Sequence, residues 1–111
     1  MPSLADTKPE FEIVNTENGA LALLKGRVDI DSSPALRDRL IALLDAPHAT
    51  VSIDLSGVTH IDSSGVATLI EALRIARNRN TELTLQGLDD RLHRLFEATG
   101  ILSLFDKGSD R

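Results

Sequence analysis

The sequence predicts an α/β fold with a mixed sheet of about four or five strands and the helices packed on one face. Alternating apolar and polar residues at 51–55 and 81–86 are typical of strands with one buried and one wetter face. A parallel sheet covered on both faces would instead show continuous apolar runs. Because helical patterns separate these strands, we expect the order ββαβαβα with two right-handed strand–helix–strand crossovers.

The chain is expected to form a single domain over residues 11–105. Its 111 residues are enough to bury one core. Residues 1–10 are polar with two prolines and are predicted to be a flexible lead-in, and residues 106–111 a tail. We expect a monomer, because the pattern leaves no large apolar face without a partner.

The first two strands, predicted over 11–14 and 20–25, form a hairpin. The turn between them contains Asn18-Gly19, which supplies the positive-φ residues that a tight hairpin loop needs. Residues 26–31 are predicted to be a connection to the first helix.

The first helix is predicted to begin at a cap, Ser32 or Ser33, and to stop before Pro47. Pro34 then occupies the first helical position, where a missing N–H costs nothing. Four leucines repeat at helical spacing and should face the core: Leu36, Leu40, Leu43 and Leu44.

A polar turn is expected after the 51–55 strand, leading to Asp62 and to a helix over about 64–79. The apolar residues of this helix form one core stripe: Val66, Leu69, Ile70, Leu73 and Ala76. Its polar residues are expected to face outward: Thr68, Glu71, Arg74 and Asn78. Ile75 falls almost opposite the stripe, beside Ala67, and is either a stray exposed residue, which is common, or a partner contact.

The last strand, over 81–86, leads to a third helix that begins at Asp89 or Asp90 and ends at Thr99. Gly100 is the residue that terminates this helix, and Ile101 should pack back on its end. Its expected core residues are Leu92, Leu95 and Phe96, and residues 102–105 form a final apolar patch.

Composition excludes several classes of function. The net charge of −5 opposes binding to a phosphate backbone, and three Phe without Trp or Tyr offer no stacking platform, so we expect no nucleic-acid partner. The chain has no cysteine, no long apolar run and no secretory leader, so we expect a cytoplasmic protein without membrane insertion.

Catalysis and cofactor binding are not expected. Ser63 lacks the preceding glycine of a hydrolase nucleophile elbow, because Ile61 stands there. The three histidines show no ligand spacing, so no metal site is predicted, and no glycine-rich phosphate loop indicates a cofactor. Four acids are expected near strand ends, where carboxylates usually cap or face solvent rather than catalyse: Asp29, Asp31, Asp54 and Asp62.

The candidate site is the run Asp62-Ser63-Ser64-Gly65, at the N-terminus of the second predicted helix. Free backbone N–H groups and the positive end of the helix dipole point there, which suits an anion contact or a charge switch. One cap would be enough for the helix, yet three cap-competent residues stand in a row. Gly65 in the first turn indicates close approach, by a neighbouring segment or by a partner.

The segment from Ile53 to Val66, IDLSGVTHIDSSGV, resembles the signature of STAS domains, specifically of the anti-sigma-factor antagonists. Gly26-Arg27-Val28-Asp29 is similar to the family's glycine-x-hydrophobic-Asp segment. The run LHRLFEATG, ending at Gly100, resembles its late helix. The resemblance covers residues 11–105 and implies a STAS-like domain without catalysis of its own.

In that family the serine directly after the aspartate is phosphorylated by a kinase that is also the anti-sigma factor. The resemblance therefore implies Ser63 as the acceptor. The implied kinase is of the histidine-kinase ATPase type, and a PP2C-like phosphatase removes the phosphate again. Only the unphosphorylated protein is expected to bind the kinase. We expect a partner-binding surface made of Asp29, Asp62, Ser63, Ser64, Gly65, Ala67 and Ile75.

A second resemblance leaves an alternative open. The run LTLQGLDDRL, from Leu83 to Leu92, is also similar to the small STAS subunit of bacterial phospholipid-transport ABC systems, which supports an ATPase. The adjacent serines Ser63-Ser64 fit the phosphorylated group better, because those subunits more often carry Thr-Gly after the aspartate.

Overall fold

The structure is a computed structural model that describes residues 10–47 and 49–104. Its elements follow the predicted order: β1 (Glu10–Asn15), β2 (Gly19–Val28), α2 (Ser33–Asp45), β3 (Thr50–Ile61), α3 (Ser63–Asn78), β4 (Glu82–Gln86) and α4 (Asp90–Thr99). A short helical turn follows at 101–104. The predicted lead-in over 1–10 is wrong at Glu10, which begins β1. Its residues 1–9 and the predicted tail over 106–111 lie outside the described residues.

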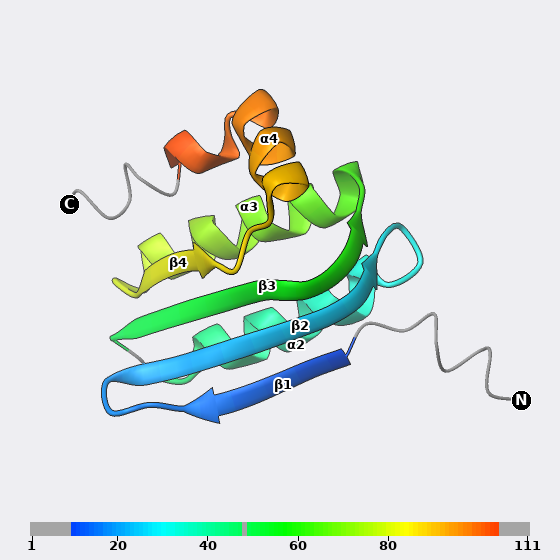
Figure 1. The fold of residues 1–111 in the computed structure, drawn as a ribbon. Coiled ribbons are helices and arrows are strands. Elements are labelled where there is room, and N and C mark those ends of the chain that lie inside the picture. Colours follow the sequence, from blue (N-terminus) through cyan, green and yellow to red (C-terminus); the bar gives the residue numbers. More distant parts are fainter. Residues whose placement is uncertain (1–9, 48, 105–111) are drawn as a thin grey trace, which may run out of the picture.

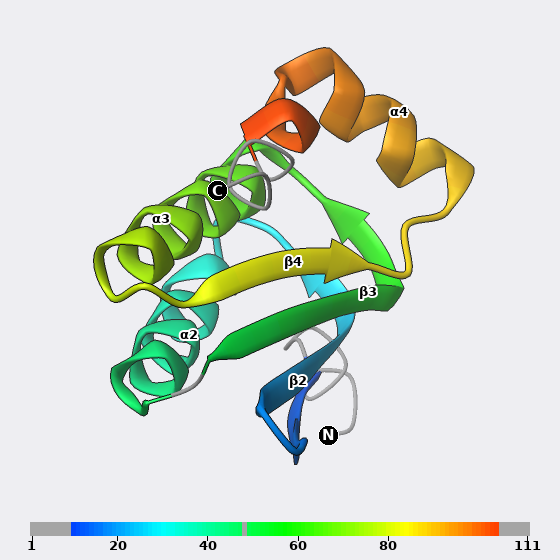
Figure 2. The same ribbon diagram turned by 90° about the vertical axis from the view of Figure 1, so that its left-hand side faces the viewer.

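The four strands form one mixed sheet, as predicted, and their order across the sheet is β1-β2-β3-β4 (Figure 1). β1 pairs antiparallel with β2, whereas β2, β3 and β4 are parallel neighbours. Helices α2 and α3 lie side by side on one face of the sheet, and α4 stands beyond the end of β4 (Figure 2). No helix in the described part of the chain has the length and apolarity needed to cross a membrane.

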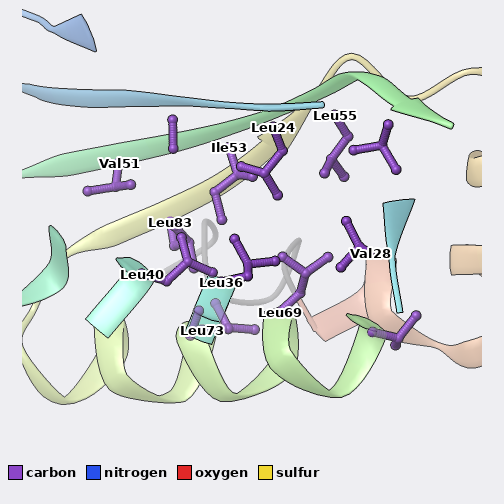
Figure 3. Packing of buried hydrophobic residues seen from close by; sticks show 14 of the residues in the cluster. Leu24, Val28, Leu36, Leu40, Val51, Ile53, Leu55, Leu69, Leu73 and Leu83 are labelled. Carbon is purple, nitrogen blue, oxygen red and sulfur yellow. The ribbon is translucent and has the colours of Figure 1, made fainter. Parts of the chain in front are cut away.

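The core lies between the sheet and the two helices and is aliphatic apart from Phe96 (Figure 3). Leu24, Ile53 and Leu83 of successive strands point toward the helices, and Leu40 and Leu69 meet them there. Phe96 and Ile101 are fully buried in the same cluster, so α4 closes one end of the core.

Two strands are longer than the sequence predicted. β2 continues to Val28 and β3 to Ile61, so the predicted connection over 26–28 and the polar turn over 56–61 are wrong. The register between β2 and β3 shifts at two places, and Gly26 in this stretch has φ of 89°. Such irregularities break the period-two pattern from which strands are recognised.

The buried face of helix α3 is wider than the core stripe that its sequence predicted. Thr68, expected on the outside, is buried, and its hydroxyl donates to the carbonyl of Ser64 at 3.0 Å. Ile75, also expected on the outside, is half-buried and packs against the core. The helix is covered by α2 as well as by the sheet, and the Arg37–Glu71 ion pair at 2.7 Å joins the two helices.

The helix ends follow the expected capping logic with one exception. Asp89 caps α4 by accepting from the N–H of Leu92 at 2.8 Å, and Gly100 ends it with φ of 80°. Ser32 occupies the cap position of α2 but makes no capping bond; its hydroxyl instead donates to the carbonyl of Arg27 at 2.9 Å. That bond ties the end of β2 to the start of α2.

Candidate functional site

The candidate site lies where β2 and β3 end and α2 and α3 begin. Parallel strands bring their carboxyl ends to the same edge of a sheet, so the two strand–helix junctions become neighbours (Figure 1). The backbone N–H of Asp62 donates to the carbonyl of Val28 at 3.1 Å. The end of β2 is thereby joined directly to the residue that caps α3.

Asp62 caps α3 with its side chain. Its Oδ1 accepts from the backbone N–H groups of Ser64 at 3.0 Å and Gly65 at 3.2 Å, and from the Ser64 hydroxyl at 2.6 Å. The Ser64 hydroxyl, more than any other group, lowers the pKa of Asp62 below its ordinary value of 3.8, and this outweighs the opposing effect of partial burial. Asp62 is therefore a carboxylate at neutral pH.

Ser63 is the first residue of α3 and its side chain is exposed. Within residues 10–47 and 49–104, its hydroxyl has no hydrogen-bond partner. It combines solvent access with a place at the positive end of the helix dipole, where added negative charge is stabilised.

Ser64 is held in place by its neighbours. Its hydroxyl lies 2.6 Å from Asp62 Oδ1 and 3.2 Å from the hydroxyl of Ser33 on α2. Ser33 Oγ also donates to the carbonyl of Asp29 at 2.7 Å. These contacts form a polar connection between the starts of α2 and α3, so Ser64 is a structural part of the site.

Asp29 organises the turn after β2. Its Oδ1 accepts from the backbone N–H groups of Asp31 at 3.0 Å and Ser32 at 3.2 Å, and its Oδ2 lies 3.5 Å from Arg27 Nε. Partial burial raises the pKa of Asp29, but the backbone N–H groups of the turn outweigh it, so the pKa lies below 3.8. Asp29 thus adds a second carboxylate to the same edge.

Gly65 is buried, and the close approach that the sequence indicated comes from within the chain. A Cβ at this position would lie 2.6 Å from Ile61 Cγ1, 2.7 Å from Val28 Cγ1 and 2.9 Å from the Val28 carbonyl oxygen. Gly65 therefore lets α3 start tightly against the ends of both strands, and it presents no side chain to a partner.

Of the last two residues expected on the partner-binding surface, one lies near the site and the other does not. Ala67 is exposed one turn into α3, on the same end of the helix as Ser63. Ile75 lies two further turns along, roughly 18 Å from the start of the helix at 1.5 Å per residue, and it packs against the core. The structure does not bring Ile75 to the site.

The four acids predicted near strand ends lie in two different places. Asp29 and Asp62 belong to the two adjoining turns of the site, and Asp31 is exposed in the turn between β2 and α2. Asp54 lies on the sheet, where its Oδ1 accepts from the Ser56 hydroxyl at 2.6 Å and its Oδ2 from Gln86 at 3.1 Å. Over the described ranges, no group of three potential metal-ligating side chains comes together.

Sequence reasoning missed three features of the site. The hydroxyls of Ser32 and Ser33 were read only as helix caps, although they bridge β2, α2 and α3. Ile30 was not singled out, although its side chain is 73% exposed beside the two carboxylates. An apolar residue between two aspartates in a turn, Asp29-Ile30-Asp31, was the available signal, because such a residue has no core to enter.

Comparison with known proteins agrees with this arrangement. The family model described as the Mlab, STAS domain matches residues 15–105. The anti-sigma-B factor antagonist of Bacillus subtilis is 30% identical over 95 residues, which cover 86% of each chain. This chain belongs to the STAS-domain family of anti-sigma-factor antagonists.

One further relative supports the family, and one solved structure supports the fold. The anti-sigma-B factor antagonist of Listeria monocytogenes is 35% identical over 81 residues, covering 73% of this chain and 71% of the relative. The crystal structure of an anti-sigma factor antagonist from Mycobacterium paratuberculosis superposes with a TM-score of 0.73 at 20% identity, covering 87% of this chain and 82% of that one. The predicted STAS fold is confirmed, and the family is non-catalytic.

Proposed function

We propose that this STAS domain is a phosphorylation-controlled antagonist that binds an anti-sigma factor when Ser63 is unphosphorylated. The anti-sigma factor is a serine kinase of the histidine-kinase ATPase type, and a PP2C-like phosphatase restores the unphosphorylated form. The observation that supports this best is the contrast between two adjacent serines. Ser63 is exposed and has no hydrogen-bond partner among the described residues, whereas the hydroxyl of Ser64 is bonded to Asp62.

The proposed switch acts on binding rather than on folding. A phosphate carries about −1.5 to −2 charges at pH 7 and, at a helix N-terminus, favours the helix by roughly 0.3–1 kcal/mol. In an interface the same charge would be desolvated beside the carboxylates of Asp62 and Asp29, and like-charge juxtaposition costs several kcal/mol. Since about 1.4 kcal/mol is a tenfold change in affinity, the interface effect dominates.

The antagonist function is tested with the purified anti-sigma kinases encoded in the source genome. Wild-type protein should bind one of them and, with ATP, gain a single phosphate at Ser63 that releases the complex. Ser63→Ala should bind without becoming phosphorylated, and Ser63→Asp should not bind. Ser103→Asp is the matched control, because Ser103 is an exposed serine on the 101–104 turn.

Two results would contradict the proposal. One is wild-type protein that binds none of these kinases. The other is stable association with an ABC-transporter ATPase that Ser63→Asp leaves intact, which would favour the phospholipid-transport subunit instead.

A further inference from the structure

We propose that Ile30 is an apolar anchor of the partner interface and that it selects an anti-sigma factor with an apolar pocket bordered by basic side chains. The inference rests on the proposed function and adds a residue outside the phosphorylation motif. Its basis is the exposure of Ile30, the rigidity of the turn that carries it and the charges around it.

Ile30 is the most exposed large apolar side chain that the structure describes, at 73%, against 44% for Val14. Scattered apolar residues are common on protein surfaces, so exposure alone decides nothing. Ile30, however, stands in the turn that leads from the site's edge of β2 into α2, rather than on an outer strand. Its neighbour Val28 bonds through its carbonyl to Asp62, the residue before Ser63.

The turn holds Ile30 outward before any partner arrives. The N–H of Asp29 donates to Ser32 Oγ at 2.9 Å, and the N–H of Ser33 donates to the carbonyl of Asp29 at 2.8 Å. These bonds close the backbone on both sides of Ile30. A side chain presented on a fixed backbone loses little conformational entropy on binding, which is the property of an interface anchor.

The backbone of Ile30 also lies near Asp62, the residue before Ser63. Its N–H group faces the Asp62 carboxylate and contributes to lowering the pKa of that group. Val28 lies two residues before Ile30, and its carbonyl accepts from the N–H of Asp62, the residue before Ser63. Ile30 and Ser63 are therefore on adjoining turns at the same edge of the sheet, where one docking partner can cover both.

The surrounding charges specify the complementary surface. Asp29 and Asp62 are carboxylates with lowered pKa values, and Asp31 directly follows Ile30. An apolar centre with a charged rim is the usual arrangement of a binding hot spot. The matching partner surface is an apolar pocket with lysine or arginine on the side that faces Asp29 and Asp31. These cations would attract a phosphate, so they must lie away from Ser63, where added phosphate ends binding by desolvation beside Asp62.

The two residues then have separate roles. Ile30 supplies affinity that does not change with phosphorylation, and Ser63 supplies the charge that ends binding. Burial of one isoleucine side chain corresponds to roughly a tenfold to hundredfold change in the dissociation constant.

The test measures dissociation constants for the anti-sigma kinase that binds the wild-type protein in the experiment above. Ile30→Ala should weaken binding roughly tenfold to hundredfold, and Ile30→Leu should restore most of it. Val14→Ala is the matched control, since it shortens another exposed apolar residue, on β1, and should change binding less than about threefold. Melting temperatures of Ile30→Ala and wild type should coincide, because the side chain is exposed.

The outcomes separate the two proposals. If wild-type protein binds, Ser63→Asp does not, and Ile30→Ala binds as tightly as wild type, the anchor is wrong and the proposed function stands. An equal loss in Val14→Ala and Ile30→Ala would also overturn the anchor. If wild-type protein binds no anti-sigma kinase, both proposals fail.

Discussion

The hydroxyl of Ser64 donates a 2.6 Å hydrogen bond to the carboxylate of Asp62, while the adjacent Ser63 is exposed and its hydroxyl bonds to nothing in the part of the chain that the structure describes. The two serines are one residue apart in sequence but differ in chemical availability. Transfer of a phosphate to Ser64 would first have to break its bond to Asp62 and its contact with Ser33.

This difference predicts which serine accepts phosphate. Ser63→Ala should stay unphosphorylated when incubated with the cognate kinase and ATP, with no transfer to Ser64. Mass spectrometry of the intact protein and of its peptides measures this directly. A phosphate found on Ser64 in the Ser63→Ala variant would contradict the assignment.

The stability of the fold should be insensitive to charge at residue 63. Ser63→Asp places a negative charge at the N-terminus of α3, where the dipole favours it by roughly 0.3–1 kcal/mol. We expect the thermal melts of Ser63→Asp and Ser63→Ala to nearly coincide, by circular dichroism. A large loss of stability in Ser63→Asp alone would indicate an unfolding switch.

Removal of the α3 cap should destabilise the protein. Asp62→Ala deletes the acceptor of two backbone N–H groups and should lower the free energy of unfolding by about 0.5–2 kcal/mol, whereas Asp62→Asn should retain most of the cap. Urea denaturation measures both. Asp31→Ala, an exposed acid nearby, is the control and should stay within about 0.5 kcal/mol of wild type.

Gly65→Ala should destabilise the protein although alanine favours helices. The added methyl group would lie within 3 Å of the Val28 carbonyl oxygen and of two side chains. Overpacking of this kind costs about 1–3 kcal/mol, more than the gain of roughly 0.5–1 kcal/mol in helix propensity. Thermal melts report the balance, and a raised melting temperature would refute the tight approach of α3 to β2.

Acid should destabilise the fold partly through Asp62. Its pKa is lower in the folded protein than its ordinary value of 3.8, so its contribution to stability is complete above about pH 5. That contribution is lost as the pH falls through 3.8 toward the folded-state pKa, because the unfolded chain then binds the proton more readily. Urea denaturation at pH 7, 5 and 3 should show a smaller loss for Asp62→Asn than for wild type, and parallel losses would contradict this.

Much of the architecture was predictable from sequence because local signals agreed with the fold. The alternation at 51–55, the cap at Asp89 and Gly100 after Thr99 each act within a few residues. The predictions that failed depended on distant neighbours. Val58 and Ile61 belong to β3 because β2 continues beside them, and Thr68 is buried because α2 covers that side of α3.

The candidate site was also predictable only in its local features. Residue order alone placed Asp62, Ser63 and Ser64 at the start of a helix, since capping chemistry is local. Residue order also indicated a close approach at Gly65, but not which atoms make it. The identity of those atoms depends on β2, which lies some 37 residues earlier in the chain and is brought to α3 only by parallel pairing with β3.

Local sequence thus specified the elements and the order in which they follow one another. Tertiary packing gave Ser64 a contact with Ser33 on another helix while Ser63 stayed exposed. It also placed Gly65 in the interior and left Ile30 facing solvent. The physical reason is that helix capping and side-chain periodicity act between near neighbours, whereas burial and strand pairing depend on segments that meet only after the chain has folded.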